Sequence, residues 1–364
     1  MSPEFTRRGA LQAIGLWMGA SPLLKSQDLQ QKLAGEPPGR IIPREEIINA
    51  FEMEAMAQRS LPARVFAEIE GNDDRSAFDR ITFRPRMLVD VTQLDLTVDL
   101  FGTKMYAPIV VGPASDQQRF HPDGELALVR GASTAQTAVV VSDRSSQPIE
   151  RIVAEAKAAP LWYQIYPETD MPPVLARVQQ AVKAGCRAVC ITIGTPYQPG
   201  AAGSPLKLVK LASPRMDWSI VDQVRQAAKV PVLLKGVMNP DEARSAVQHG
   251  VSGVLVSAQA GRFVPGLASP IEMLPAIADA VGAQIPVLVD GGFRRGTDVL
   301  AALALGARAV LVTRPALWGL AAYGADGVQT MLEMLQTETA RDMALCGKRN
   351  LAAVDRSLVK IHPR

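Results

Sequence analysis

Eight short apolar runs, each followed by a stretch with helical periodicity, constrain the fold of this chain more than any other feature. The runs are rich in Val, Ile and Leu throughout, as expected of strands that are buried on both faces. Eight such strands alternating with helices predict an α/β fold, a closed (β/α)8 TIM barrel rather than an open sheet. The predicted strands cover residues 108–112, 137–142, 161–166, 188–193, 231–235, 252–257, 286–290 and 309–313.

Helices are predicted between these strands and on both sides of the barrel. Before the barrel, residues 44–70 predict helix, broken at Leu61-Pro62, and a short strand is expected near 88–91. The apolar face of the first helix is predicted to consist of Ile47, Ile48, Phe51 and Ala55. We therefore expect an N-terminal helical extension followed by the barrel, together covering residues 44–364. The later helices are predicted near 123–135, 148–158, 172–184, 216–229, 239–249, 270–282, 297–306 and 325–345.

The first 43 residues differ in character from the rest. Thr6-Arg7-Arg8 precedes a mildly apolar run from Ala13 to Leu24, which is typical of a twin-arginine export signal. The run is too short to span a bilayer as a mature helix. We expect a signal over 1–24, a polar linker over 25–43 and a periplasmic location in a bacterium. The alternative is an ordinary amphipathic first helix, and then a cytoplasmic protein.

The composition excludes several classes of partner and site. A net charge of +3 without a long basic run argues against nucleic acid and anionic membranes. A hydrophobic fraction of 48% and a charged fraction of 21% are those of a globular protein with a sizeable core. The chain has three cysteines, Cys186, Cys190 and Cys346, and this odd and small number argues against a disulfide framework. With only three histidines in addition, a zinc site is not expected.

Two consecutive predicted strands end in groups that suit an anion. Asp290-Gly291-Gly292 closes one strand, Arg294 follows, and Thr313-Arg314 closes the next strand. The glycines let backbone N–H groups approach a ligand, and the helix N-terminus beyond them favours negative charge. A (β/α)8 barrel commonly holds a phosphate after its seventh and eighth strands. The alternative is two tight turns with solvated arginines.

The other strand ends carry hydroxyls, amides and one lysine. In such a barrel the chemistry takes place at the C-terminal ends of the strands. Lys235 there is able to stabilise an anionic form of a bound ring, although a strand-end lysine with its head in solvent is the alternative. The connection from Thr195 to Met216, rich in Gly, Pro and Ala, is the predicted lid. The remaining strand ends are Pro113-Ala114-Ser115, Ser142-Asp143-Arg144, Gln164-Ile165-Tyr166, Thr192-Ile193-Gly194 and Ser257-Ala258-Gln259.

Motifs along nearly the whole barrel resemble one known family. They include Phe83-Arg84-Pro85-Arg86, His121-Pro122-Asp123-Gly124-Glu125, Gln164-Ile165-Tyr166, Lys235-Gly236-Val237 and Asp290-Gly291-Gly292-Phe293-Arg294-Arg295-Gly296-Thr297-Asp298. With these residues the chain is similar to the FMN-dependent 2-hydroxy acid oxidases and dehydrogenases, such as glycolate oxidase and lactate oxidase. The similarity runs from about Arg44 to the last helix.

The resemblance implies a set of FMN contacts. Pro113, Ala114 and Ser115 would line the isoalloxazine, while Ser142, Gln164 and Thr192 would bond its edge. Lys235 would face flavin N1 and O2, with Ser257 on the ribityl side and Asp290 on the ribityl hydroxyls. The phosphate would be held by Gly291, Gly292, Arg294, Thr313 and Arg314. The family usually has glycine at the position of Thr313.

The substrate side departs from the family. Gln259 stands at the position of the family's catalytic histidine, and Gly194 at that of the aspartate that orients it. A neutral amide does not accept a proton near pH 7, so the base is missing. Glu68 stands where the family has a tyrosine that meets the substrate carboxylate, and an anion there should repel a carboxylate. Arg262, the family's carboxylate clamp, and Tyr166 are retained.

Three hypotheses remain open at this point. The first is an FMN-binding oxidoreductase with altered or weakened chemistry, in which Glu68 moves a proton or no base is needed. The second is a non-catalytic FMN-binding or partner-binding protein. The third is a phosphate-binding barrel without flavin that uses Lys235. If the first hypothesis holds, we expect a small carboxylate substrate and an electron acceptor such as oxygen, a quinone or a periplasmic carrier. Separately, the resemblance implies a homotetramer.

Overall fold

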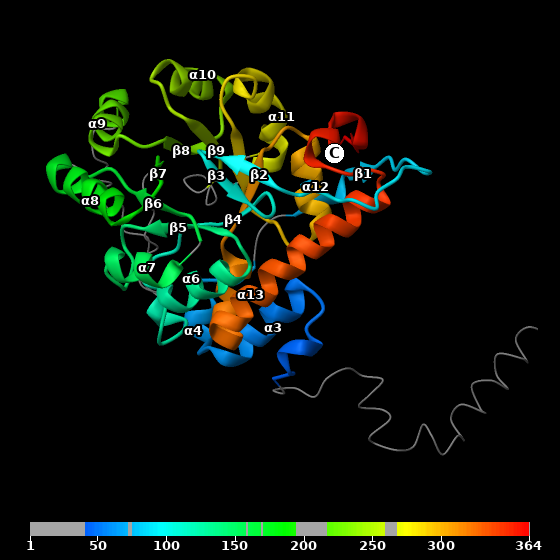
Figure 1. Ribbon diagram of the computed structural model, residues 1–364, viewed down its shortest axis with the longest axis horizontal. Helices are drawn as coiled ribbons and strands as arrows, with labels where there is room; N and C mark the ends of the chain where they lie inside the picture. The colour runs from blue at the N-terminus through cyan, green and yellow to red at the C-terminus, as the bar shows by residue number, and fades with distance from the viewer. Residues whose placement is uncertain are drawn as a thin grey trace, which may run out of the picture. The chain divides into compact units, whose positions relative to one another are not determined.

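The fold was analysed in a computed structural model, which describes residues 41–71, 75–157, 159–168, 170–193, 217–258 and 268–363. Residues Pro43–Arg364 form one compact unit. Its centre is a closed barrel of eight parallel strands in the order β10-β11-β4-β5-β6-β7-β8-β9 (Figure 1). All eight predicted strands are confirmed. They are β4 (Ile109–Val111), β5 (Ala138–Ser142), β6 (Leu161–Ile165), β7 (Ala188–Thr192), β8 (Val232–Val237), β9 (Gly253–Val256), β10 (Val287–Asp290) and β11 (Ala309–Val312).

The helices that alternate with these strands are confirmed as well. They are α6 (Glu125–Thr134), α7 (Ile149–Ala156), α8 (Met171–Ala184), α9 (Trp218–Ala228), α10 (Pro240–Gln248), α11 (Pro270–Val281), α12 (Gly296–Ala304) and α13 (Arg314–Leu345). The last helix begins 11 residues before the predicted 325, directly after β11. Pro315 lies in its first turn, where its missing N–H costs nothing. A break at Tyr323 and Gly324 divides the helix, which is why only its second part showed a continuous pattern.

The N-terminal extension is helical but differs from the prediction in detail. It comprises η2 (Arg44–Glu46), α3 (Ala50–Ser60), α4 (Ala63–Phe66) and α5 (Ser76–Asp79), with the break at Leu61-Pro62 confirmed. Asn49 caps α3 by accepting from Phe51 N and Glu52 N. The predicted apolar face is partly wrong, because Ile48 is 70% exposed and Phe51 is 45% exposed. The helix starts only at Ala50, so Met53, Met56 and Ala57 make the buried face instead.

The strand predicted near 88–91 is not formed, and this prediction was wrong. Leu88 has φ of +60° and is fully exposed, so that segment cannot pair in a sheet. The strand lies a few residues earlier, in β1 (Ile81–Phe83), which pairs antiparallel with β12 (Val359–Ile361) at the end of the chain. Short 3-10 turns, Leu351–Ala353 and Arg356–Leu358, precede β12.

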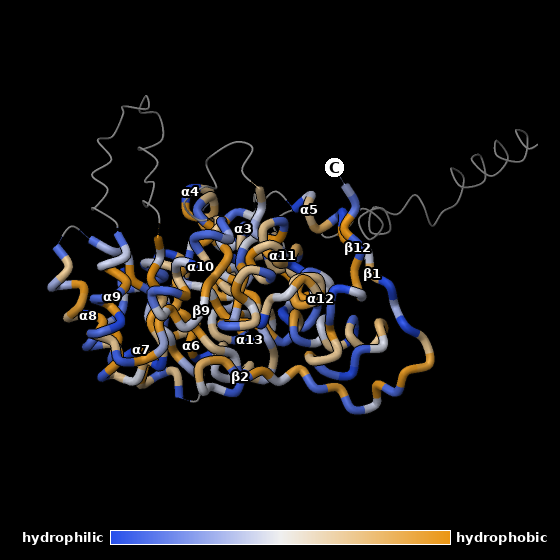
Figure 2. The backbone as a smooth tube through the Cα atoms, turned by 90° about the horizontal axis from the view of Figure 1, so that it is seen from above, coloured by the Kyte–Doolittle hydropathy of each residue, from blue (hydrophilic) through white to orange (hydrophobic). Residues whose placement is uncertain are grey.

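A β-hairpin closes the N-terminal end of the barrel. Its strands are β2 (Val98–Leu100) and β3 (Thr103–Met105), and Val98, Leu100 and Met105 pack into the barrel core. The Phe101 ring meets the inward-facing Trp162 ring edge-on, with centroids 5.3 Å apart. In Figure 2 β2 lies at one edge of the view and α4 at the opposite edge. The C-terminal strand ends are therefore the open end of the barrel, on the side of the N-terminal helices.

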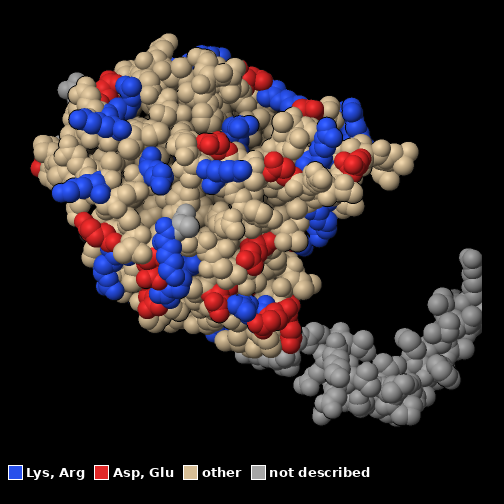
Figure 3. Space-filling model, in the orientation of Figure 1, with Lys and Arg blue, Asp and Glu red and all other residues tan. Residues whose placement is uncertain are grey.

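Several sequence predictions fall outside the described residues. These are the signal over 1–24, nearly all of the linker, the lid at 195–216, and the substrate-side positions Gly194, Gln259 and Arg262. On the face that Figure 3 shows, basic and acidic side chains are interspersed. No helix in the part of the chain that the structure describes is long and apolar enough to cross a membrane.

Candidate active site

A layer of polar side chains faces the barrel interior at its open end. The core inside the barrel includes a layer with one residue from each strand, namely Val110, Val140, Trp162, Cys190, Leu233, Leu255, Leu288 and Leu311. Side chains alternate between the two faces of a strand, so the residue two positions further on faces the same interior. This rule gives Gly112, Ser142, Gln164, Thr192, Lys235, Ser257, Asp290 and Thr313, which we call the polar layer. Seven of these eight are among the cofactor residues predicted from the sequence.

Direct contacts hold the polar layer together. Lys235 Nζ lies 2.7 Å from Asp290 Oδ2 and donates to Ser257 Oγ at 2.8 Å. Lys235 is only 3% exposed, and a buried ammonium group is tolerated because these partners offset its loss of water. On the neighbouring strands, Gln164 Nε2 donates to Thr192 Oγ1 at 3.0 Å. The structure therefore brings a cation, a carboxylate, an amide and hydroxyls to one surface, and Lys235 is not a solvated strand-end lysine.

The loop from Asp290 to Arg295, which we call the phosphate loop, has the backbone that its glycines predict. Gly291 has φ of +96° and Gly292 of +81°, a region that residues with a Cβ rarely adopt. A Cβ on Gly292 would also lie 3.0 Å from the Phe78 ring. The loop leads directly into the N-terminus of α12, where backbone N–H groups favour an anion.

The two predicted phosphate-binding arginines are both held in place. The Arg294 guanidinium lies over the Trp318 ring, 4.6 Å from its centroid, and donates to Phe293 O at 2.9 Å. Arg314, at the start of α13, donates to Glu70 O at 3.0 Å. Because β10 and β11 are paired neighbours, both arginines follow adjacent strand ends.

Sequence reasoning missed two residues that support the phosphate loop. Arg75 donates to Gly292 O and to both carboxylate oxygens of Asp298, at 2.9 and 3.2 Å. Asp298 also accepts from the backbone N–H groups of Arg294 and Arg295, at 2.8 and 2.9 Å. Asp298 had a local signal, because an acidic residue at the third position of a helix commonly caps it. Arg75 had none, since it lies 217 positions from Gly292 in the sequence.

On the substrate side, Tyr166 and Glu68 both contact arginines. The Arg144 guanidinium lies 4.7 Å from the centroid of the half-buried Tyr166 ring. Glu68 forms an ion pair with Arg119, whose Nε is also 3.9 Å from Asp116. The negative charge of Glu68 is therefore compensated by Arg119, which the sequence did not indicate.

The three histidines of the chain all lie outside the polar layer. His121 Nδ1 accepts from Asp123 N at 3.1 Å in the loop before α6. His249 stacks on Trp218 and contacts Asp222 at 3.2 Å, between α9 and α10. His362 contacts Thr82 at 2.9 Å, next to β12. Each imidazole is thus held by contacts outside the polar layer.

Asp143 directly follows Ser142 of the polar layer, and its pKa is shifted from the ordinary value. Burial raises the pKa of Asp143, and the nearby Arg144 and Arg177 oppose that rise. Asp143 follows the inward-facing Ser142, so its side chain points outward, with Oδ2 3.6 Å from Arg177 Nη2 on α8. It therefore faces the helices around the barrel and is no substitute for an inward-facing base.

The cysteines take no part in the site. All three are buried and free. Burial raises the pKa of the Cys186 and Cys190 thiols to about 12, so both stay protonated and unreactive at neutral pH. Of these, Cys190 faces the barrel interior, one layer below Thr192.

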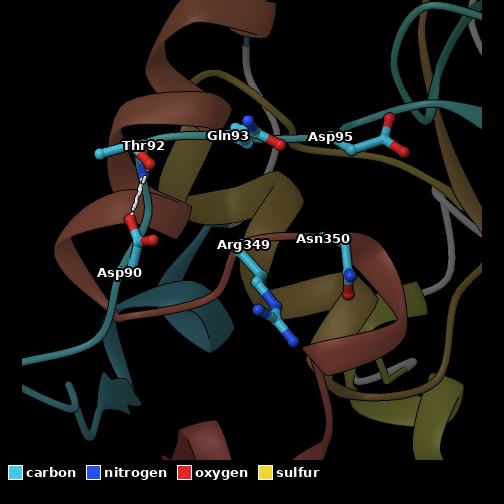
Figure 4. Close-up of a pocket in the computed structure, with 6 residues that line it drawn as sticks. All are labelled: Asp90, Thr92, Gln93, Asp95, Arg349 and Asn350. Atoms are coloured by element: carbon cyan, nitrogen blue, oxygen red, sulfur yellow. Dashed lines mark hydrogen bonds between the residues drawn. The ribbon is translucent and has the colours of Figure 1, made fainter.

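A polar cavity of about 410 Å³ lies at the other end of the barrel, beside the start of β2 (Figure 4). Its carboxylates are occupied locally: Asp90 accepts from Thr92 N and Oγ1, and Asp95 accepts from Thr97 N. The two segments that line it are joined by a backbone hydrogen bond, from Asp95 N to Arg349 O at 2.9 Å. The cavity is remote from the polar layer, and is lined by Asp90, Thr92, Gln93, Asp95, Arg349 and Asn350.

The described groups fit FMN by their chemistry at both ends. The polar layer offers an ammonium group, an amide and hydroxyls, which match the oxygen and nitrogen atoms of a flavin edge. The phosphate loop offers two glycines with positive φ, a helix N-terminus and Arg294, which match a phosphate.

Comparison with known proteins agrees with this geometry. The family model of FMN-dependent dehydrogenases matches residues 52–204 and 198–361. The chain is 33% identical to 2-hydroxyacid oxidase 1 of Homo sapiens, covering 89% of this chain and 98% of that protein. It is also 33% identical to L-lactate oxidase of Nostoc sp., covering 86% and 98%. A crystal structure of mandelate oxidase superposes with a TM-score of 0.79 at 35% identity, covering 87% of this chain and all of the other. This chain belongs to the family of FMN-dependent dehydrogenases.

Proposed function

We propose that this protein is an FMN-dependent oxidoreductase that acts on a small 2-hydroxy acid by altered or weakened chemistry. FMN is the cofactor. The observation that carries the proposal is a complete polar layer and phosphate loop combined with Gln259 at the position of the catalytic histidine. Relatives named lactate oxidase and mandelate oxidase support a small hydroxy acid with one carboxylate as the substrate.

Each part of the described site has a proposed role in holding the cofactor. Pro113, Ala114 and Ser115, on the loop after β4, line the ring with backbone groups. Ser142, Gln164 and Thr192 hydrogen-bond its edge, and Lys235 stabilises negative charge at N1 and O2. Ser257 and Asp290 face the ribityl chain. Gly291, Gly292, Arg294, Thr313 and Arg314 hold the phosphate.

The weak point of the proposed site is proton transfer. When bound, FMN would supply the acceptor for a hydride, that is, for the hydrogen and the two electrons of the C–H bond at the carbon that bears the substrate hydroxyl. The chain must remove the hydroxyl proton, and neither Gln259 nor Gly194 is able to accept one. Arg262 and Tyr166 are left to bind and orient the carboxylate, while Glu68, at the position of the family's substrate tyrosine, takes or gives a proton, or no base is needed. Oxidation of simple 2-hydroxy acids should therefore be slow.

The test is to rebuild the missing pair. We expect the Gln259→His plus Gly194→Asp protein to oxidise lactate, glycolate or mandelate about 10²- to 10⁴-fold faster than the unchanged protein, the usual contribution of a general base. The measurement is anaerobic flavin reduction, followed as loss of absorbance after mixing. Gln259→Asn is the matched control, because it changes the same position without adding a base. Full-rate oxidation by the unchanged protein would overturn the proposal.

The alternative is an FMN-binding or partner-binding protein without turnover, which the same missing base also favours. It predicts a yellow protein whose absorbance no hydroxy acid lowers, even after hours of anaerobic incubation. Slow loss of flavin absorbance with any of the hydroxy acids tested would show that the protein is an enzyme. If the rebuilt pair gives no activity either, the rest of the substrate pocket has diverged too.

A further inference from the structure

Arg75 bridges Gly292 of the phosphate loop and Asp298 in the first turn of α12 without belonging to either segment. It comes from the segment before α5, while the loop follows β10. Its guanidinium donates to Gly292 O and to both carboxylate oxygens of Asp298. Nη1 takes part in both contacts, and Nη2 completes the bidentate pair with Asp298. The rings of Phe51 and Phe78 lie against it, with centroids 5.8 and 5.2 Å from its central carbon.

The Gly292 contact matters because of the backbone on either side of it. Two consecutive residues with positive φ do not form regular secondary structure, and no ladder holds them. A hydrogen bond from a cation to the Gly292 carbonyl fixes the orientation of the peptide that follows. That peptide carries the N–H group of Phe293, within the segment proposed to meet the phosphate.

The Asp298 contact matters because of charge. Asp298 is 5% exposed, and its Oδ2 is 2.8 Å from the backbone nitrogen of Arg294. This carboxylate shapes the loop through the N–H groups of Arg294 and Arg295, but its negative charge lies next to a site for a phosphate. The bidentate pair with Arg75 neutralises it in a region with little water to screen it.

We propose that Arg75 is a positioning residue for the cofactor phosphate: it orients the Gly292 peptide and neutralises Asp298, and so raises the affinity for FMN without touching it. The inference rests on the phosphate site of the proposed function. It assigns Arg75 to the phosphate end alone, because its contacts reach the phosphate loop and none of them reaches the polar layer residues Lys235, Gln164 or Thr192.

The test compares FMN with riboflavin, which has the same ring and ribityl chain but no phosphate. The full-length chain is stripped of flavin, and both dissociation constants are measured by quenching of flavin fluorescence. Arg75→Gln is expected to raise the dissociation constant for FMN about 10- to 100-fold, as for a lost charged hydrogen bond, while that for riboflavin changes by less than about twofold. Arg80→Gln is the matched control: Arg80 pairs with Glu272 on α11 and donates to His362 O rather than to Gly292 or Asp298, so the ratio of the two dissociation constants should not change.

A second variant separates charge from packing. Asp298→Asn added to Arg75→Gln removes the carboxylate left without its partner, and should recover part of the lost FMN affinity. Arg75→Lys keeps the positive charge but loses the paired N–H groups of the guanidinium. Its dissociation constant for FMN should lie between those of the unchanged protein and Arg75→Gln. If Arg75→Gln does not fold, Arg75→Lys replaces it in the comparison of FMN with riboflavin.

Equal weakening of FMN and riboflavin would show that Arg75 only maintains the fold, and an unchanged FMN affinity would show that it has no role; either result overturns the inference. If the unchanged protein does not prefer FMN over riboflavin, the proposed phosphate site itself fails. These outcomes differ, so failure of the inference is distinguishable from failure of the proposed function.

Discussion

At the scale of single residues, Gly112 and Thr313 are a matched pair across the β4–β11 junction. A Cβ on Gly112 would lie 2.1 Å from Thr313 Oγ1, which no real contact allows. The missing side chain on one strand therefore makes room for the hydroxyl on the next. The space left by Gly112 thus accommodates the Thr313 hydroxyl at the strand end that is proposed to meet the phosphate.

This pairing gives a prediction that two substitutions can test. Gly112→Ala alone should clash with Thr313 and cost about 1–3 kcal/mol of the free energy of unfolding, as overpacked cores do. Adding Thr313→Gly removes the clash, and most of the stability should return. Denaturant unfolding of the two single variants and the double variant measures the coupling. A double variant no more stable than Gly112→Ala would show that the two positions do not interact.

At the scale of elements, α13 is the longest helix among the described residues and the one with a built-in break. It starts with Arg314, at the proposed phosphate site, and runs on to pack against α3 and α6. Gly324, at φ of +62° and ψ of −139°, sits in a region open essentially to glycine alone. Its backbone also passes close to the His121 ring, at the motif that leads into α6. The break thus lets one helix serve the phosphate end and still cover the outside of the barrel.

Filling that break should be costly. We expect Gly324→Ala to lower the free energy of unfolding by about 1–3 kcal/mol, because alanine is strained there and its Cβ would lie 2.9 Å from His121 Nε2. Thermal or denaturant unfolding provides the measurement. Gly102→Ala is a useful comparison, since Gly102 also has positive φ but no atom within 4 Å of the added Cβ. Equal losses for the two variants would mean that the His121 contact adds nothing.

At the scale of the whole molecule, the site exists only because the barrel closes. Every strand contributes one residue to the polar layer. The N-terminal extension is attached to α13, because Trp318 Nε1 on that helix donates to Ile69 O at 2.8 Å. The segment that leads into the barrel also pairs with the segment that follows it, through β1 and β12. A piece of the chain that lacks any one of the eight barrel strands would therefore lack part of the proposed cofactor site.

The leader belongs to this scale too, since we propose that the folded protein is exported by the twin-arginine route. Replacing both Arg7 and Arg8 with lysine should leave the protein in the cytoplasm, because this signal depends on the arginine pair rather than on positive charge. Fractionating bacterial cells that express the full chain measures this, with Lys25→Arg as the control. A cytoplasmic location of the unchanged protein, or continued export of the variant, would refute the proposal.

The sequence by itself determined the eight strands, the helices between them and the polar character of the strand ends. These features are local: an apolar run, a helical period or an Asp-Gly-Gly turn is visible in a few neighbouring residues. Boundaries went wrong where the local pattern was ambiguous, as at residues 88–91, where a strand-like run is left exposed.

Only the tertiary structure decided which side chains meet. The pairing of Arg75 with Gly292, of Glu68 with Arg119 and of Gly112 with Thr313 joins positions far apart in the chain. Such contacts leave no periodic signal, because they depend on how the closed barrel brings its strand ends and flanking segments together. The outward direction of Asp143 is decided in the same way, by its place next to Ser142 in a strand whose inner face only the closed sheet defines.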